Sequence, residues 1–388
     1  MRVVVVAEYY PRAGDPVLGV WAHRQAIAAR DAGADVRVLV LHRPLPPLSA
    51  LRARDGAAIA APLRQPRTAT LDGIEVRYVR YLSPPRPLAY GGWGAWAAPS
   101  LGRALRALRA SFAFDLVHAH YAVPAGDAVR RAAPGVPVVV SVHGGDVLAT
   151  VDRGRRARNA VQRTLAGARL VLANSADTAR RCRQHGAREV RVVHLGTDVP
   201  ASPTNPAGRT LVSVGHLVER KRHADVVRAL ATLDRRFADV TYVVVGDGPQ
   251  REPLRALAVQ LGVADRVQLR GQLAPAAAQA TAGEGALFVL PSVDEAFGVA
   301  YVEAMAAGVP AIGCRGEAGP EEIAAAGGGM VLVEPGDPQA LAQRITALLD
   351  DTAGTRELGA LARENVRADF TWKRCGEATL SAYREALR

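Results

Sequence analysis

The chain of 388 residues is longer than one hydrophobic core usually supports, so we expect two domains of about 180 to 200 residues each. No apolar run reaches the roughly 18 residues that a membrane-spanning helix needs, and the opening run Val3–Ala7 ends at Glu8, too early for a signal-peptide core. Cys182, Cys314 and Cys375 lie far apart and form no CxxC pair, which argues against a disulfide framework or a zinc module. We therefore expect a cytoplasmic protein.

The positive charge of the chain is concentrated in its first half. Residues 1–200 contain 29 Arg and 14 acidic residues, whereas residues 201–388 contain 20 basic and 23 acidic residues. This asymmetry suggests a first half that faces an anionic membrane, an acidic substrate or nucleic acid, and a solvated arginine-rich surface explains it equally well. No recognised nucleic-acid-binding fold accompanies the charge, so we expect no nucleic-acid partner.

In chain order, short β-branched runs alternate with alanine-rich helical segments through the first half. Continuous apolar strands separated by helices are typical of a parallel sheet that is buried on both faces. The predicted strands are Val3–Ala7, Asp35–Leu41, Leu116–His118, Val136–Val142, Leu170–Ala173 and Val190–Val193. Arg43–Thr70 and Ser83–Pro99 are rich in proline, and we predict long irregular loops there, which are often functional.

The same alternation restarts after a segment rich in proline and glycine. We place an N-terminal domain at residues 1–198, a linker at residues 199–208 and a second domain at residues 209–370. The strands predicted for the second domain are Thr210–Val214, Val240–Val245, Arg266–Leu269, Ala286–Leu290, Val309–Gly313 and Met330–Val333. The fold class that follows is α/β, with two doubly wound, Rossmann-like units.

The stretch Pro291–Pro310 combines the exit of a strand with the start of a helix. We predict a helix from about Gly298 up to Gly308, which ends it. The backbone amides of Phe297, Gly298 and Val299 would lie at its N-terminus, where amides without an intrahelical partner suit phosphate or hydroxyl oxygens. In an open α/β sheet this turn lies where ligands bind.

Two glutamates accompany this helix start. Glu295 lies in the loop before the helix and Glu303 lies about one and a half turns into it, so the two carboxylates can hold different parts of one ligand. A glutamate that complements the helix dipole, together with a solvated Glu303, is the competing explanation. The spacing alone favours that second explanation.

Two further strand exits in the same domain point to phosphate binding. Gly215 permits a tight exit from its strand, and His216 and Lys221 follow it, the lysine near the start of the next helix. The sequence VGDGPQ at Val245–Gln250 is a second glycine turn. Cationic groups here would neutralise a diphosphate leaving group. Taken alone, Lys221 is more simply interpreted as a surface lysine and His216 as a loop histidine without a ligand. Three such turns in the correct order favour a donor site.

With these motifs, the second half resembles the donor domain of retaining glycosyltransferase family 4. The family has the GT-B architecture, in which two Rossmann-like domains face each other across a cleft, and it includes mannosyl, N-acetylglucosaminyl and teichuronic-acid transferases. Glu295 and Glu303 match its Glu-x7-Glu motif, and its diphosphate-binding Arg and Lys fall on His216 and Lys221. The resemblance implies transfer of a hexosyl or N-acetylhexosaminyl group, with retention, from a nucleotide-diphosphate sugar to a hydroxyl acceptor. A UDP-sugar is the expected donor.

The resemblance extends over most of the chain and assigns further roles. His143, in SVHGGDVL, matches the histidine of the family's HG-x-D motif, with Asp146 ordering the loop, and Gly19 begins a GxxxxRQ-like segment. The residues expected to act in catalysis are His143, Lys221 and Glu295. The residues expected to bind the donor are Gly19, His216, Lys221, Arg270, Gln272, Glu295, Ala296, Phe297, Gly298, Val299 and Glu303. Residues 371–388 are expected to form a helix that packs back on the N-terminal domain.

The chain contains no Asp-x-Asp triplet, the metal-binding signature of the other large transferase architecture, so we expect transfer without a metal or another cofactor. Two alternatives stay open: a GT-B enzyme that is not a transferase, such as a sugar-nucleotide 2-epimerase, and a nucleotide-sugar-binding protein without chemistry. The acceptor is not identified by any motif. The basic first half favours peripheral contact with the inner face of an anionic membrane, and a soluble acceptor is the alternative.

Overall fold

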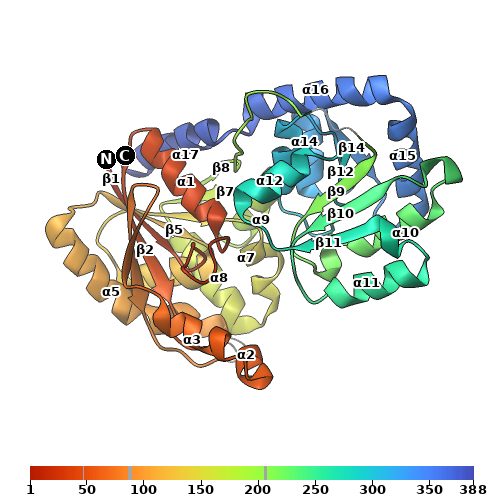
Figure 1. Ribbon diagram of the computed structural model, residues 1–388. Helices are drawn as coiled ribbons and strands as arrows, with labels where there is room; N and C mark the ends of the chain where they lie inside the picture. Colours follow the sequence, from red (N-terminus) through yellow and green to blue (C-terminus); the bar gives the residue numbers. More distant parts are fainter. Residues whose placement is uncertain (47, 86–89, 205–207) are drawn as a thin grey trace. The chain divides into compact units, whose positions relative to one another are not determined.

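The computed structural model describes residues 1–46, 48–85, 90–204 and 208–388 (Figure 1). The chain divides into two compact units. Unit 1 contains Met1–Leu195 together with Trp372–Arg388, and unit 2 contains Gly196–Thr371. Residues 205–207 of the expected linker lie outside the described residues, as do residue 47 and residues 86–89.

Within the described ranges, unit 1 contains an eight-stranded sheet in the order β3-β4-β2-β1-β5-β6-β7-β8. Its strands are β1 (Arg2–Ala7), β2 (Asp35–His42), β3 (Thr68–Leu71), β4 (Ile74–Arg80), β5 (Leu116–His120), β6 (Val138–Val142), β7 (Leu170–Ala173) and β8 (Val190–Val192). All neighbours pair in parallel except β3 and β4. On β1, Val4 and Val6 face one hydrophobic cluster and Val3 and Val5 face the other, so apolar residues at every position bury the strand on both faces.

Helices cover the sheet of unit 1. They are α1 (Val20–Asp31), α2 (Leu48–Ala53), α3 (Gly56–Arg64), α5 (Trp93–Ser111), α6 (Asp127–Ala132), α7 (Gly145–Leu148), α8 (Arg155–Gly167), α9 (Ala176–Gln184) and α17 (Trp372–Ala386). The C-terminal helix α17 packs closely on α1: a Cβ added to Gly376 would overlap the carbonyl oxygen of Ala28. Gln25 on α1 also donates to Thr379 Oγ1 at 3.1 Å.

The prediction of two long irregular loops in this unit is wrong. The first stretch holds α2, α3 and β3, and α5 begins at Trp93 within the second, because alanine and leucine outweigh the prolines, of which Pro62 and Pro99 lie inside helices. The β3–β4 hairpin was missed as well. Asp72 and Gly73 form its turn with positive φ angles of 46° and 79°, the backbone that an Asp-Gly pair favours between two strands.

In the part of the chain that the structure describes, unit 2 contains a six-stranded parallel sheet in the order β11-β10-β9-β12-β13-β14. Its strands are β9 (Thr210–Val214), β10 (Thr241–Val245), β11 (Val267–Gly271), β12 (Leu287–Val289), β13 (Ala311–Cys314) and β14 (Met330–Val333). Its helices are α10 (His223–Thr232), α11 (Arg251–Gln260), α12 (Pro275–Gly283), α13 (Val299–Ala306), α14 (Ala318–Ala326), α15 (Pro338–Asp350) and α16 (Thr352–Asp369). Every strand predicted for this unit is present within about two residues of its predicted ends.

The strand order of unit 2 fixes where a ligand can bind. The chain leaves β9 toward β10 on one side and returns to β12 on the other side, so the order reverses between β9 and β12. Loops that leave the carboxyl ends of these two strands separate and form a crevice, which is the usual binding position in open α/β sheets. None of the helices in the described ranges is long and apolar enough to cross a bilayer.

Candidate active site

The loops after β9 and β10 are held together by backbone contacts. Leu217 donates its amide to Asp247 O at 3.0 Å, and Gln250 donates to Leu217 O at 2.9 Å. A Cβ added to Gly246 would overlap the carbonyl oxygen of Gly215, and Gly246 has a φ of 140°. The glycine turn at residues 245–250 therefore lets the backbones approach, which fixes the loop that carries His216 and Lys221.

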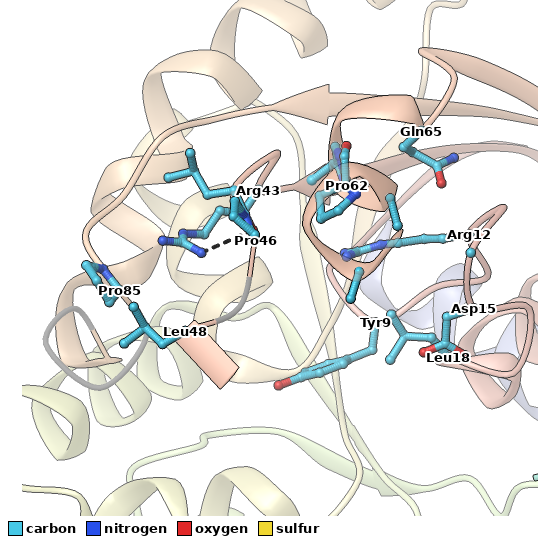
Figure 2. Close-up of a pocket in the computed structure, with 15 residues that line it drawn as sticks. Tyr9, Arg12, Asp15, Leu18, Arg43, Pro46, Leu48, Pro62, Gln65 and Pro85 are labelled. Atoms are coloured by element: carbon cyan, nitrogen blue, oxygen red, sulfur yellow. Dashed lines mark hydrogen bonds between the residues drawn. The ribbon is translucent and has the colours of Figure 1, made fainter. Parts of the chain in front are cut away.

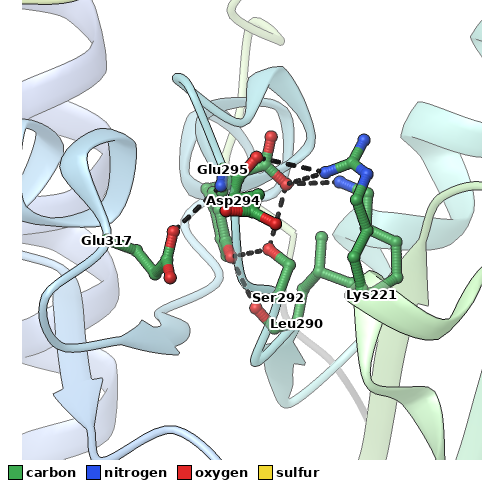
Figure 3. A network of polar contacts seen from close by, with 8 residues as sticks. Lys221, Leu290, Ser292, Asp294, Glu295 and Glu317 are labelled. Atoms are coloured by element: carbon green, nitrogen blue, oxygen red, sulfur yellow. Dashed lines mark hydrogen bonds and ion pairs between the residues drawn. The ribbon is translucent and has the colours of Figure 1, made fainter. Parts of the chain in front are cut away.

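A buried carboxylate lies where the loops after β9 and β12 meet (Figure 3). Glu295 is only 9% exposed, and its Oε2 forms an ion pair with Lys221 Nζ. Ser292 Oγ donates to the same oxygen at 2.9 Å, and Arg220 Nη1 lies 3.9 Å from it. Lys221 and Arg220 come from the β9 loop, in the one-turn 3₁₀ helix Glu219–Lys221 that precedes α10, so the ion pair joins the loops that follow β9 and β12.

Opposing effects set the charge of this carboxylate. Burial is the largest influence on the pKa of Glu295 and raises it, but the ion pair with Lys221, the nearby Arg220 and the hydrogen bond from Ser292 together hold the pKa below its usual range. Glu295 therefore stays ionised at neutral pH. At Glu317, burial and the neighbouring negative charges of Asp294 and Glu295 raise the pKa of the carboxyl.

Hydrogen bonds fix the backbone on which Glu295 stands. Its amide donates to Glu317 Oε2 at 2.9 Å, and its carbonyl oxygen accepts from the Gly319 amide at 3.1 Å. On the other side, the fully buried Tyr301 hydroxyl donates to Leu290 O and lies 3.0 Å from Ser292 Oγ. The carboxylate is thus preorganised before any ligand binds, as an electrostatic site requires.

The helix that follows begins as the sequence predicts. Gly298 precedes the first residue of α13 with a left-handed backbone, φ 90°, and no side chain caps this end of the helix. Ala296 is half-buried, while Phe297 is buried and packs on Phe370 with 5.6 Å between ring centroids. Phe297 therefore anchors the turn through its side chain, and any ligand contact from it has to use the backbone.

The other residues predicted to bind the donor lie in different surroundings. Glu303 is half-buried on α13, and Val299 is the first residue of that helix. His216 is exposed in the β9 loop. Arg270, on β11, lies 3.8 Å from Glu284 Oε2, and Gln272 is exposed directly after that strand. The structure brings Lys221 and Glu295 into contact. The roles of Arg270 and Gln272 in donor binding stay predictions.

In unit 1, His143 belongs to a row of stacked histidines. Its Nε2 lies 3.1 Å from His120 Nδ1, and the two rings are parallel within 7°. His118 follows, with 4.5 Å between its ring centroid and that of His120, and its Nδ1 is hydrogen-bonded to the Tyr383 hydroxyl at 2.7 Å. His118 and His120 were not predicted as site residues, although two histidines separated by one residue on a strand share a face.

The loop after His143 and the start of α1 are also fixed by packing. Asp146 is fully buried and its Oδ1 accepts from the Val123 amide at 3.3 Å, so it ties this loop to the segment after β5, in line with the ordering role that the resemblance implies. Gly19, with a φ of 66°, caps α1, and a Cβ there would overlap the carbonyl group of Tyr9. A glycine is therefore required at position 19 by packing alone, and its role in donor binding stays a prediction.

Lowering the pH from 7 to 5 is expected to destabilise unit 1. Burial lowers the pKa of His118 and of His143 to about 3 and lowers that of His120 well below its usual value, so each histidine binds a proton near pH 6.5 only after unfolding. The unfolded state then holds more protons, and stability falls as the pH drops below about 6.5. Asp146 opposes this, because burial raises its pKa to about 7 and it gains a proton on folding below that pH.

Burial also lowers the pKa of His23, His42 and His185 in this unit, so the histidines together outweigh Asp146 and predict a net loss of stability on acidification. The measurement is the urea midpoint of the whole chain at pH 7 and at pH 5, for the native sequence and for His120→Asn. The native chain should lose more stability between the two pH values than the variant does. Equal midpoints at both pH values in the native chain would contradict the buried neutral histidines.

Two family models together match nearly the whole chain. The model described as Glycosyltransferase Family 4 matches residues 18–200, and the model described as Glycosyl transferases group 1 matches residues 197–366. D-inositol 3-phosphate glycosyltransferase 1 of Catenulispora acidiphila is 31% identical over 362 residues, which cover 84% of this chain and 85% of that protein. The chain belongs to the family 4 glycosyltransferases. This glycosyltransferase is also 32% identical over 219 residues to the lipopolysaccharide core biosynthesis glycosyltransferase LpsD of Rhizobium meliloti, and that match covers 53% of this chain and 61% of LpsD.

Solved structures of glycosyltransferases share the fold. Sucrose-phosphate synthase from Thermosynechococcus elongatus aligns with a TM-score of 0.79 at 20% identity and covers 99% of this chain and 98% of its own. Anabaena Alr3699/HepE in complex with UDP-glucose aligns with a TM-score of 0.73 at 21% identity and covers 99% of both chains. The predicted fold class, two Rossmann-like α/β units of the GT-B type, is confirmed.

Proposed function

We propose that this glycosyltransferase moves a hexosyl or N-acetylhexosaminyl group from a UDP-sugar to a hydroxyl acceptor, with retention of configuration and without a metal ion. The observation that carries the proposal is the Lys221–Glu295 ion pair at the point where the strand order of unit 2 reverses. The choice of uridine is supported by the UDP and UDP-glucose complexes of Alr3699/HepE, which has the same fold.

The leaving group explains why few titratable residues are needed. The acceptor oxygen forms a bond to the anomeric carbon, the bond from that carbon to the diphosphate oxygen breaks, and the acceptor proton passes to a phosphate oxygen of the donor. The nucleoside diphosphate leaves as an anion, so the protein mainly positions the reactants and stabilises the developing negative charge. Lys221 and the uncapped amides of Gly298 and Val299 supply positive charge and hydrogen-bond donors for it.

The two carboxylate oxygens of Glu295 have different roles in this proposal. Lys221, Arg220 and Ser292 all contact Oε2. We assign Oε1 to the hydroxyl groups of the transferring sugar, because an ionised carboxylate accepts such hydrogen bonds strongly. Glu303 is assigned to the ribose, Arg270 and Gln272 to the base, and His216 and Gly19 to the phosphates.

His143 acts in this scheme as a neutral imidazole. Burial lowers its pKa to about 3, so it is not a cation at neutral pH. Its Nδ1 is buried and has no hydrogen-bond partner among the described residues. A hydrogen bond from this nitrogen to the sugar or its leaving phosphate would satisfy it.

Acceptor-dependent release of UDP tests the function against its alternatives. With UDP-glucose and UDP-N-acetylglucosamine as donors, we expect slow hydrolysis alone, faster UDP release when an acceptor is added, and the same rates in EDTA. A 2-epimerase would convert the donor without an acceptor, and a binding protein would give no UDP at all. Loss of turnover in EDTA, with recovery on adding a divalent cation, would contradict the metal-free mechanism.

We also propose that unit 1 contacts an anionic membrane surface through its excess of arginine. Co-sedimentation of the whole chain with phosphatidylglycerol vesicles should be strong at low salt and should weaken as salt rises, because screening shortens the reach of exposed charges. Neutral phosphatidylcholine vesicles are the control. Equal binding to both kinds of vesicle, or binding that does not depend on salt, would contradict an electrostatic contact.

A further inference from the structure

A pocket of about 760 Å³ lies within unit 1, beside the loop after β1, the end of β2 and helix α3 (Figure 2). This volume is in the range of small-molecule sites. Most of its lining side chains are aliphatic or proline, among them Leu18, Leu45, Pro46, Leu48, Ala61 and Pro62. The donor-site residues of unit 2 take no part in it, so this pocket is separate from the Lys221–Glu295 pair.

One cation of the pocket has only neutral partners. The guanidinium group of Arg43 is half-buried and donates to the carbonyl oxygens of Ser83 and Leu45 at 3.3 and 3.5 Å, both of them long contacts. No ion pair between described side chains includes Arg43. A guanidinium group in this situation has donors left to bind a phosphate or carboxylate.

The cation and the anion of the pocket lie at different sides of it, and the cation lies beside aliphatic side chains. Figure 2 shows Arg43 at one side together with Pro46, Leu48 and Pro85, whereas Asp15 lies at the other side. The carboxylate of Asp15 is therefore remote from Arg43 and does not oppose an anion there. An anionic group on Arg43 would be adjacent to aliphatic side chains.

A buried histidine is also among the residues that line the pocket. His42 is 1% exposed, its Nε2 donates to Pro62 O at 2.8 Å, and its Nδ1 is buried without a hydrogen-bond partner among the described residues. Because the proton is on Nε2, Nδ1 is a hydrogen-bond acceptor.

The apolar lining of the pocket continues into leucines that are exposed to solvent. Leu45 and Leu48 line the pocket and remain 37% and 44% exposed, and Leu51 on the next turn is 47% exposed. Arg52 and Arg54 follow them on the surface. Exposed leucines that continue a pocket and end at arginines suit an aliphatic chain attached to an anion.

We propose that this pocket binds the acceptor of the transfer and that the acceptor is an anionic amphiphile. Its phosphate lies on Arg43, and its aliphatic chain crosses Leu45 and Leu48. The role as acceptor rests on the proposed glycosyl transfer, whereas the binding of the amphiphile rests on the pocket alone.

Titration calorimetry of the whole chain with farnesyl monophosphate tests the chemistry of the pocket. Farnesol carries the chain without the anion and inorganic phosphate carries the anion without the chain, so each half is measured alone. We expect farnesyl monophosphate to bind at least about tenfold tighter than either half. Equal affinity for farnesyl monophosphate and farnesol would overturn the role of Arg43, and equal affinity for farnesyl monophosphate and inorganic phosphate would overturn the role of the leucines.

Two variants locate the binding. Arg43→Ala and Leu48→Asp should each weaken farnesyl monophosphate binding about tenfold or more, and Leu48→Asp keeps the test valid if Arg43→Ala loosens its loop. Arg67→Ala, an exposed arginine that does not line the pocket, removes the same charge as Arg43→Ala and should change nothing. Undiminished binding in both pocket variants would overturn the proposal.

The binding of UDP separates this proposal from the donor site. All three variants should bind UDP as the native chain does, because they lie in unit 1 outside the donor-binding residues. UDP binding without farnesyl monophosphate binding would overturn the acceptor class alone. Farnesyl monophosphate binding without UDP binding would contradict the donor site and with it the acceptor role.

Discussion

Replacing Lys221 by alanine is expected to lower turnover by about two orders of magnitude or more. The substitution removes the cation that pairs with Glu295 and leaves that carboxylate buried, so the pKa of Glu295 should rise toward protonation. Glu295→Ala should have an effect of similar size. The double variant should lose little more than either single variant, because the two side chains act as a unit.

The chain offers a matched control for this experiment. Lys373 is the only other lysine in the sequence, and it is exposed on α17 in unit 1. Lys373→Ala should leave turnover unchanged. Near-native turnover in both Lys221→Ala and Glu295→Ala, or fully additive losses in the double variant, would contradict the assignment of this pair.

Replacing Gly298 by alanine is expected to disturb both the stability of unit 2 and its activity. Gly298 has a φ of 90°, and a side chain there costs about 1–3 kcal/mol in backbone strain. The new Cβ would also overlap the ring of Tyr301, which cannot move freely because it is fully buried and its hydroxyl is bonded to Leu290 O. Overpacking of this kind adds about 1–3 kcal/mol, and the shift reaches Glu295 through Ser292.

Urea unfolding and steady-state kinetics check this prediction together. Gly316 also has a positive φ, 76°, but nothing lies within 4 Å of a Cβ added to it. Gly316→Ala therefore measures the backbone strain alone and should leave turnover near native. A Gly298→Ala variant that is no more destabilised than Gly316→Ala and keeps native turnover would contradict the overlap with Tyr301.

The regular part of the fold could be predicted from the sequence because the strands are continuous apolar runs. Thr210–Val214, Leu170–Ala173 and Met330–Val333 have the predicted ends. The β3–β4 hairpin was not predicted, although its Asp72–Gly73 turn carries a clear local signal. The predicted strand Leu116–His118 ends two residues before the end of β5, and His120 is one of the two residues that it leaves out.

The contacts within the site were harder to predict from the sequence than the strands. Lys221 and Glu295 were each predicted to meet the donor, yet 74 positions separate them, and only the pairing of β9 with β12 brings their loops together. Tyr301 and Glu317 gave no signal, because they act through the backbone and side chains of the Glu295 loop. The stretch around Arg43 was predicted to be an irregular loop of a kind that is often functional, but the pocket also needs residues of the β1 loop, such as Tyr9 and Leu18, which the pattern does not indicate.

The donor site at Lys221 and Glu295 is the central claim, and titration calorimetry with UDP tests it most directly. UDP should bind the native chain and Lys373→Ala with the same affinity, and it should bind Lys221→Ala at least about tenfold more weakly, because a charge-assisted contact with the diphosphate is lost. Equal UDP affinity in Lys221→Ala and the native chain would contradict the placement of the diphosphate on this lysine.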